Sequence, residues 1–266
     1  MLSSIFLYLC IGAVAGVLAG LLGVGGGLVI VPLVTYSFAF QGIESDVTHK
    51  IALATSLATI MFTSVSSFMA HHRNKAVMWS VFKAVTPGIL IGTFLGTKVV
   101  TLVPETPLKI FFVCFLYYTA SQMFLNIKPK ASRQIPGPVG NSAAGMVIGG
   151  VSSLVGIGGG TLSVPYMTWC NIPIHKAIGT SAAIGFPIAV AGALGNIVNG
   201  WGLSDVDYSL GLIYLPALIG IAAASVCTAP FGAKIAHKLP IGKLKKIFAC
   251  LLITVATQML YQLVTA

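Results

Sequence analysis

A glycine-rich stretch occurs twice in this chain. Residues 20–36 read GLLGVGGGLVIVPLVTY, and residues 153–169 read SLVGIGGGTLSVPYMTW. At an offset of 133, four glycines and one proline coincide: Gly23, Gly25, Gly26, Gly27 and Pro32 match Gly156, Gly158, Gly159, Gly160 and Pro165. Because a run of glycines destabilises a helix interior, each copy predicts a helix, a break and a second helix.

Two further blocks repeat in the same order. The sequence HKIALATSLA at 49–58 matches HKAIGTSAA at 175–183, and residues 104–125 match residues 240–260. Three matching blocks in one order indicate an internal duplication. We therefore divide the chain into a first repeat (1–125), a polar cytoplasmic linker (126–138) and a second repeat (139–266).

The composition is that of a membrane protein. Of 266 residues, 56% are hydrophobic and only 8% are charged, and the mean hydropathy is +0.96. A soluble domain carries roughly 25% charged residues, so a soluble enzyme, a nucleic-acid binder and a disordered tail are excluded. The apolar runs are continuous and do not alternate with polar residues, which favours helices over a barrel. We expect an all-α polytopic membrane protein of roughly eight to ten segments, at ~20 residues each.

Each repeat contains five apolar segments, of which the second is short. The expected segments are 3–22, 27–40, 48–70, 79–101 and 106–125, then 139–155, 160–171, 177–199, 207–229 and 243–263. Segment 160–171 is too short to cross a bilayer without help. We therefore expect each glycine-linked pair to form a helical hairpin that turns within the membrane, although a fully spanning hairpin stays open.

The charges predict the orientation. With the basic loops at 71–78, 126–138 and 230–246 placed in the cytoplasm, and Lys83 and Lys176 also inside, 12 of the 15 basic residues lie inside and all five acidic residues lie outside. The loop after the third segment is then inside in the first repeat and outside in the second. The repeats should therefore have inverted topology, an architecture of secondary transporters whose substrate site lies near the midplane. Both termini are predicted to be periplasmic.

The glycine clusters are the first candidate site. Each is followed by a helix, whose free N–H groups and positive dipole end attract anions. Two such ends meeting from opposite sides would bind an anion without a buried lysine. The candidate residues are Gly25, Gly26, Gly27, Gly158, Gly159 and Gly160. The alternative is that these glycines only allow tight packing, which is how we interpret the GxxxG spacings elsewhere in the chain.

Hydroxyl groups recur one to two turns into the third segment of each repeat. Thr55 and Ser56 match Thr180 and Ser181, and their hydroxyls can donate hydrogen bonds to an oxyanion. The alternative is a bond back to the carbonyl group four residues earlier in the same helix.

A histidine–lysine pair begins the same segments. His49 and Lys50 lie on the outer side, and His175 and Lys176 on the inner side. A cationic mouth on each side would concentrate anions. The alternative is a lysine whose ammonium group reaches the membrane interface from a helix end.

Several absences narrow the function further. No acidic residue lies in the interior of an apolar segment, since Asp207 stands at the very start of 207–229, and this disfavours coupling through a buried carboxylate. The chain has no P-loop and no HExxH or GxSxG motif. We expect no enzyme activity, no cofactor and no metal site. We interpret the matched pair Gln122 and Gln258 as interhelical hydrogen-bonding residues, and Cys114 and Cys250 as packing residues.

The repeated GxGGG-x(4)-P pattern, followed by a helix with Thr-Ser, resembles the sulfite exporter TauE/SafE family (TSUP permeases). The resemblance covers nearly the whole chain, although Ala54 stands where the family more often has glycine. It implies a bacterial inner-membrane permease that exports sulfite or a small organosulfonate by alternating access. An anion channel, an uptake permease for another sulfur compound and a non-transporting membrane subunit remain alternatives. The expected partners are a small sulfur oxyanion and the lipid bilayer, not nucleic acid, and the GxxxG faces permit a homodimer.

Overall fold

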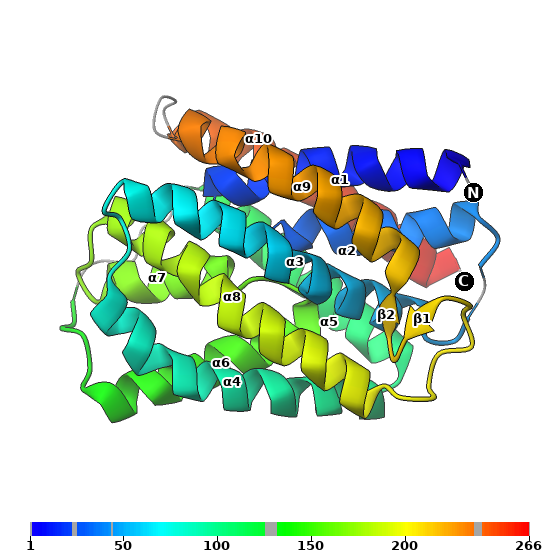
Figure 1. The fold of residues 1–266 in the computed structure, drawn as a ribbon, viewed down its shortest axis with the longest axis horizontal. Helices are drawn as coiled ribbons and strands as arrows, with labels where there is room; N and C mark the ends of the chain where they lie inside the picture. Colours follow the sequence, from blue (N-terminus) through cyan, green and yellow to red (C-terminus); the bar gives the residue numbers. More distant parts are fainter. Residues whose placement is uncertain (1, 23–25, 44, 126–131, 237–240, 266) are drawn as a thin grey trace.

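The computed structural model describes residues 2–22, 26–43, 45–125, 132–236 and 241–265 (Figure 1). This part of the chain forms ten helices and one short hairpin. The helices of the first half are α1 (Leu2–Leu22), α2 (Gly27–Phe40), α3 (Thr48–Arg73), α4 (Trp79–Leu102) and α5 (Glu105–Phe124). Those of the second half are α6 (Pro138–Val155), α7 (Gly160–Trp169), α8 (Ile174–Asn199), α9 (Leu215–Ala236) and α10 (Ile241–Thr265). Strands β1 (Ser209–Leu210) and β2 (Ile213–Tyr214) precede α9.

Helices dominate because a helix satisfies its own backbone hydrogen bonds, as hydrocarbon requires. Among the described residues, six helices are long and apolar enough to cross a membrane, namely α1, α3, α4, α8, α9 and α10. The helix breaks and the short second helices are confirmed: α2 has 14 residues and α7 has 10, against the ~20 needed for a span. By length and composition, six helices qualify as spans where eight to ten were expected. Helices α2 and α7 are short, α5 has polar residues near both of its ends, and α6 mixes glycine and serine with its apolar residues.

The expected segment 207–229 is wrong at its start. Helix α9 begins only at Leu215, and the residues before it form an antiparallel hairpin that pairs Ser209 with Tyr214. Gly211 has a φ of +58° in the turn, a conformation that suits a two-residue hairpin loop. The apolar run is therefore not helical around Gly211, and the residues on either side of this glycine form two short strands.

The helices of the two halves interlock. Helix α1 of the first half packs on α9 of the second half, and α6 of the second half packs on α4 of the first half. Helix α3 packs on both α8 and α9, and α5 packs on α10. Figure 1 shows α3 and α8 side by side in opposite directions, and α4 and α9 also run in opposite directions. The start of α1 and the end of α10 lie at the same end of the molecule. Helix α8 also packs on α4, so each of these extensive contacts between the halves has a counterpart with the roles of the halves exchanged or joins matching helices.

The GxxxG packing interpretation is confirmed for the α4–α6 and α1–α9 pairs. A Cβ atom on Gly92 would overlap the carbonyl group of Met146, and one on Gly16 would overlap Ser225 and Thr228. The same holds at the neighbouring spacings, where added Cβ atoms on Gly12, Gly88, Gly96, Gly145 and Gly149 would meet the partner helix. Only glycine lets these helix backbones approach so closely.

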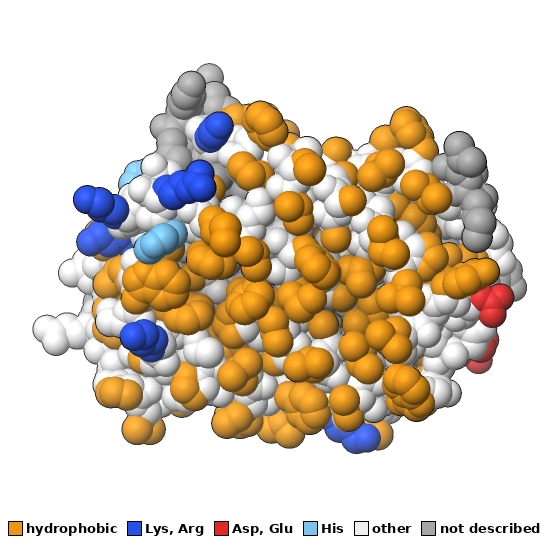
Figure 2. Space-filling model, in the orientation of Figure 1, with side chains coloured by type: hydrophobic (Ala, Val, Ile, Leu, Met, Phe, Trp, Pro, Cys, Tyr) orange, Lys and Arg blue, Asp and Glu red, His pale blue; other side chains and the backbone are white. Residues whose placement is uncertain are grey.

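Helices α3 and α8 occupy the centre of the bundle. Their membrane windows are 72% and 78% buried, whereas that of α10 is 28% buried. Apolar side chains are spread over most of the face drawn in Figure 2, as expected for a lipid-facing surface. Most of the visible lysines and arginines gather at the left end of that view, and the visible acidic side chains at the right end.

Candidate functional site

Two left-handed glycines precede the short helices. Gly26 caps α2 with φ 77° and ψ −8°, and Gly159 caps α7 with φ 76° and ψ −6°. A side chain in this region of φ/ψ space costs about 1–2 kcal/mol, which explains why glycine stands at both positions. The repeat seen in the sequence is thus also a repeat of backbone conformation. Gly25, a third candidate of the first cluster, lies outside the described residues.

The two breaks meet inside the protein. We call residues 26–27 the first glycine turn and residues 156–160 the second glycine turn. All of these residues are buried. A Cβ atom on Gly27 would lie 2.9 Å from Ile157 Cα and would overlap the Gly156 carbonyl oxygen. Candidates from both halves, Gly158 and Gly160 included, are therefore brought together at one buried place.

Ser56 and Ser181 connect the central helices to this place. Ser56 Oγ on α3 donates a 2.7 Å hydrogen bond to the Gly156 carbonyl oxygen. Ser163 Oγ on α7 donates to Ser181 Oγ on α8 at 2.9 Å. Both candidate serines are fully buried. They lie where the glycine turns are, and Ser56 is already bonded to the turn of the other half.

Thr55 and Thr180 form a second matched pair of contacts. Thr55 Oγ1 accepts a hydrogen bond from the Tyr214 N–H at 3.0 Å, and Thr180 Oγ1 accepts one from the Met78 N–H at 2.9 Å. Tyr214 directly precedes α9, and Met78 directly precedes α4. Each threonine therefore holds the start of a helix that belongs to the other half of the chain.

Bonding back to the same helix does occur, but at other hydroxyls. Thr59 Oγ1 donates to the Thr55 carbonyl oxygen at 2.8 Å, and Thr63 Oγ1 donates to the Thr59 carbonyl oxygen at 3.1 Å. These two threonines follow the alternative interpretation of the sequence, whereas Ser56 donates to the other half.

The two histidine–lysine pairs differ in exposure. The His49 ring is fully buried and packs edge-on against Phe112 at 5.3 Å. Neither of its nitrogens has a hydrogen-bond partner among the described residues. Lys50 Nζ donates to the Thr101 carbonyl oxygen at 3.1 Å. The pair predicted as an outer mouth is thus folded into the bundle.

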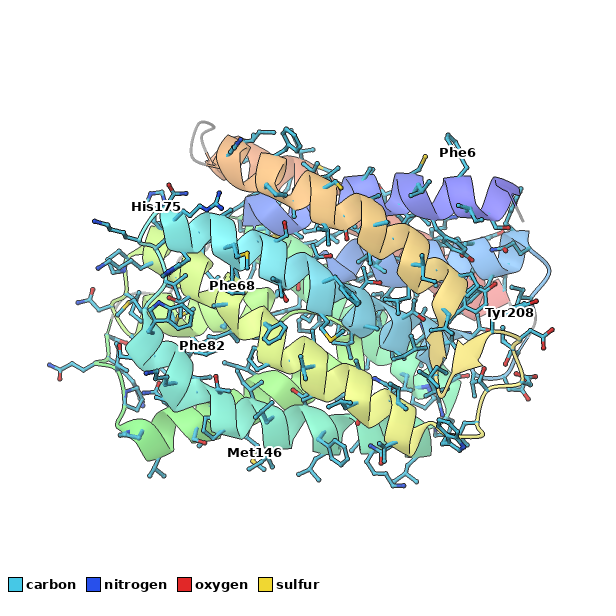
Figure 3. The ribbon with its side chains drawn as sticks, viewed as in Figure 1. Phe6, Phe68, Phe82, Met146, His175 and Tyr208 are labelled. Atoms are coloured by element: carbon cyan, nitrogen blue, oxygen red, sulfur yellow. The ribbon has the colours of Figure 1, made fainter. Side chains whose placement is uncertain are left out.

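The pair predicted as an inner mouth, by contrast, reaches the surface. His175 and Lys176 are both exposed, and Figure 3 shows His175 at the end of the molecule opposite Tyr208. Tyr208 follows the acidic loop that contains Asp205 and Asp207. The two pairs therefore occupy different environments, although their sequences match.

Two hydroxyls beside the second glycine turn were not among the sequence candidates. Ser152 on α6 is fully buried, and Thr161 on α7 is 8% exposed. Neither hydroxyl has a hydrogen-bond partner within the described part of the chain. A comparison of the two repeats could have found them, because the matching positions of the first repeat hold the apolar residues Ala19 and Leu28, so the polarity differs between the repeats.

The remaining matched residues lie away from the turns. Gln122 Nε2 donates to Tyr118 Oη four residues earlier at 2.8 Å, so its bond lies within α5 and not between helices. Gln258 is exposed, and Cys114 and Cys250 are free and exposed. These two cysteines were predicted to be packing residues, but they lie at the surface of the bundle and not in its interior.

Among the described residues, two of the surface grooves lie away from the glycine turns. One, of about 710 Å³, lies between α1 and α2, and the other, of about 500 Å³, lies among α3, α8 and α9. Neither lining includes a residue of the glycine turns or of the Thr-Ser pairs.

The comparisons with known proteins agree with this architecture. Residues 8–259 match the family described as sulfite exporter TauE/SafE. The chain is 41% identical over 262 residues to a probable membrane transporter protein of Haemophilus influenzae, covering 97% of this chain and 99% of the relative. It is 27% identical to a probable membrane transporter protein of Methanocaldococcus jannaschii, over 88% and 86% of the two chains. It is also 27% identical to the probable membrane transporter protein YunE of Bacillus subtilis, over 97% and 98%.

No solved structure matches the chain. The family match covers most of the chain. Two relatives that are named as probable membrane transporters align with this chain over nearly their whole length. The six helices of the described residues that are long and apolar enough to cross a membrane indicate a multi-pass protein. The chain therefore belongs to the sulfite exporter TauE/SafE family and is a multi-pass membrane transporter.

Proposed function

We propose that this transporter exports sulfite or a small organosulfonate anion from the cytoplasm through a site at the two glycine turns. The observation that carries the proposal is the meeting of the turns: Gly27 at the start of α2 lies against Gly156 and Ile157 of the other half. Helix N-termini bind anions through free N–H groups and a positive dipole end. The family description supports a sulfur oxyanion as the substrate.

We further propose that the chain consists of two inverted repeats, 1–125 and 139–266, joined by a cytoplasmic linker. The opposite directions of matching helices and the exchange of contacts between the halves support this proposal. The concentration of basic side chains at one end supports a cytoplasmic location for that end. Both termini would then face the periplasm of a bacterial inner membrane. Residues 126–131 of the linker lie outside the described residues.

The chemistry of the buried place favours an anion. Its polar groups are backbone amides and the hydroxyls of serine and threonine, and Ser56 and Ser181 are both within it. The acidic residues nearest in the sequence to Ser56 and Ser181 are Asp46 and Asp205, and both lie between helices. An inside-negative membrane potential pushes an anion outward with about 2.3 kcal/mol per charge per 100 mV. Export through this site therefore needs no ATP and no coupling carboxylate.

Alternating access is the proposed mechanism. The buried outer pair and the exposed inner pair support a state that is closed on the outer side. The Lys50–Thr101 hydrogen bond joins α3 to the end of α4 on that side. Opening the outer side would break this bond and expose His49 and Lys50 to periplasmic water, where they could recruit or release an anion.

The test is sulfite release from proteoliposomes loaded with sulfite, in alkaline buffer so that neutral sulfur dioxide does not leak. The potential is first clamped at zero and then imposed. Saturable release that competing sulfonates inhibit, and that an inside-negative potential accelerates, is the expected result. Protein-free liposomes are the control. Unsaturable flux with single-channel currents would replace the permease by an anion channel.

The site within the protein is tested by Gly26→Val and Gly159→Val. Each should abolish flux in protein that still elutes as a folded species, because a branched side chain would fill a turn. Unchanged flux and sulfite binding in either folded variant would contradict the site. No release from folded wild-type protein would contradict the substrate and would favour a non-transporting subunit or a different solute.

A further inference from the structure

Two unpaired hydroxyls border the second glycine turn. Ser152 lies one turn before the end of α6, and Thr161 is the second residue of α7. A Cβ atom built on Gly159 would lie 3.5 Å from Ser152 Oγ, so this hydroxyl faces the turn. Both side chains are more than nine-tenths buried, and neither has a hydrogen-bond partner among the residues that the structure describes.

Their neighbours show that pairing is available to hydroxyls in this region. Ser153, next in the chain, donates to the Gly150 carbonyl oxygen at 2.7 Å. Ser163, one turn into α7, donates to Ser181 at 2.9 Å. The large majority of buried polar side-chain atoms in proteins are paired in this way. Ser152 and Thr161 are exceptions, and both lie beside the N-terminus of the same ten-residue helix.

The matching positions around the first glycine turn are apolar. At the offset of 133, Ser152 matches Ala19 and Thr161 matches Leu28. Both Ala19 and Leu28 are fully buried. Ser163 likewise matches Ile30, which is also fully buried. The two glycine turns therefore share a backbone conformation but differ in the polarity of what surrounds them.

We propose that, within the site at the two glycine turns, the side-chain donors come from the second turn alone: Ser152 Oγ and Thr161 Oγ1 donate hydrogen bonds to the oxygen atoms of the transported anion together with the N-terminus of α7. The first glycine turn then acts as the packing partner that closes the site. Two neutral donors and a helix N-terminus suit a small anion with several acceptor oxygens, such as sulfite or the sulfonate end of an organosulfonate. This inference rests on the proposed function, since it assigns the substrate contacts of that site.

The test compares substitutions that remove one hydroxyl each. Ser152→Ala and Thr161→Val are made in the full-length protein, and sulfite affinity is measured by calorimetry in detergent and as the half-saturating concentration in proteoliposomes. Each should weaken sulfite binding about tenfold or more, because a hydrogen bond to a charged group is lost. The melting temperature should not fall, because neither hydroxyl bonds to the described protein.

Two matched controls separate this role from packing. Ser153→Ala removes a neighbouring buried hydroxyl that is already paired, so it should leave sulfite affinity unchanged and lower the melting temperature. Leu28→Val alters the matching position of the first turn and should also leave affinity unchanged. Ser152→Cys keeps the size of the side chain with a weaker donor and should give an intermediate affinity.

The outcomes distinguish this inference from the proposed function. Wild-type protein that neither binds nor releases sulfite contradicts the proposed function itself. Wild-type protein that does both, with Ser152→Ala and Thr161→Val unchanged in affinity, overturns only the present inference, and the two hydroxyls then bind water alone. Equal losses in Leu28→Val and Thr161→Val would also overturn it, because both turns would then contribute equally.

Discussion

Gly26 and Gly159 illustrate how much a single residue type can reveal. Their φ angles of 77° and 76° are accessible to glycine at little cost, whereas other residues rarely adopt them. The matched glycines in the sequence therefore predicted matched turns, and the structure confirms them. The neighbours that these turns contact could not be predicted in the same way.

A comparison of two left-handed glycines should separate backbone strain from crowding. Gly202 has φ +73° with open space around it, so Gly202→Ala should cost only the conformational strain of about 1–2 kcal/mol. A Cβ atom on Gly26 would lie 2.8 Å from the Ala15 carbonyl oxygen, so Gly26→Ala should cost more. The free energy of unfolding in detergent measures both. Equal losses would mean that α1 relaxes away from the turn.

At His49, in contrast, removing the polar atoms of the side chain should not lower the stability of the fold. A buried polar group without a partner costs roughly 1–3 kcal/mol, so His49→Leu should leave the free energy of unfolding unchanged or raise it. His175→Leu, at the exposed matching position, should change it by no more than about 0.5 kcal/mol. A clear destabilisation by His49→Leu would show that the ring has a partner. Sulfite flux in the same folded variant tests the proposed recruiting role.

At the scale of helices, Thr55 and Thr180 join the two halves. Thr55→Val and Thr180→Val should each destabilise the protein by about 1–3 kcal/mol, because a buried backbone N–H of Tyr214 or Met78 would lose its acceptor. Thr59→Val is the matched control and should cost less, since its hydroxyl bonds only to its own helix. Thermal unfolding of the purified variants compares them. Losses no larger than that of Thr59→Val would refute the role of these bonds.

The α4–α6 contact predicts opposite effects for two similar substitutions. Gly92→Ala would place a Cβ atom against the backbone of Met146, 2.7 Å from its Cα, and should strongly destabilise the bundle. Gly150→Ala would place one at 3.5 Å from the Gly92 carbonyl oxygen, an ordinary contact. It should be neutral or stabilising, by up to about 1 kcal/mol, because alanine favours a helix. Melting temperatures measured side by side decide the matter, and the reverse order would contradict the packing shown here.

At the scale of the whole molecule, charge and topology make a joint prediction. In a variant whose native cysteines are replaced, Asp207→Cys should react with a membrane-impermeant thiol reagent added to intact cells. Gln134→Cys, in the linker, should react only after the cells are opened. Both positions are exposed. The reverse labelling pattern would invert the proposed orientation and would place the basic end outside.

The limits of prediction from the sequence are clear at two elements. The segment at 207–229 was expected to be helical throughout, yet its first part forms β1 and β2. Leu210, Leu212, Ile213 and Tyr214 are apolar, and a short apolar run fits a strand as well as a helix. The helical breaks, by contrast, were predicted correctly, because several adjacent glycines have a local effect that needs no tertiary contact.

The sequence by itself determined the membrane class, the internal duplication, the glycine breaks and the unequal distribution of charge. These follow from composition and local pattern alone. Only the tertiary structure decided that His49 is buried while His175 is exposed, that Thr55 and Thr180 hold helices of the other half, and that Ser152 and Thr161 border one turn. The physical reason is that lipid-facing and protein-facing positions of a membrane helix are both apolar. Periodicity therefore cannot identify the inner face, and contacts between residues 100 or more positions apart arise only from packing.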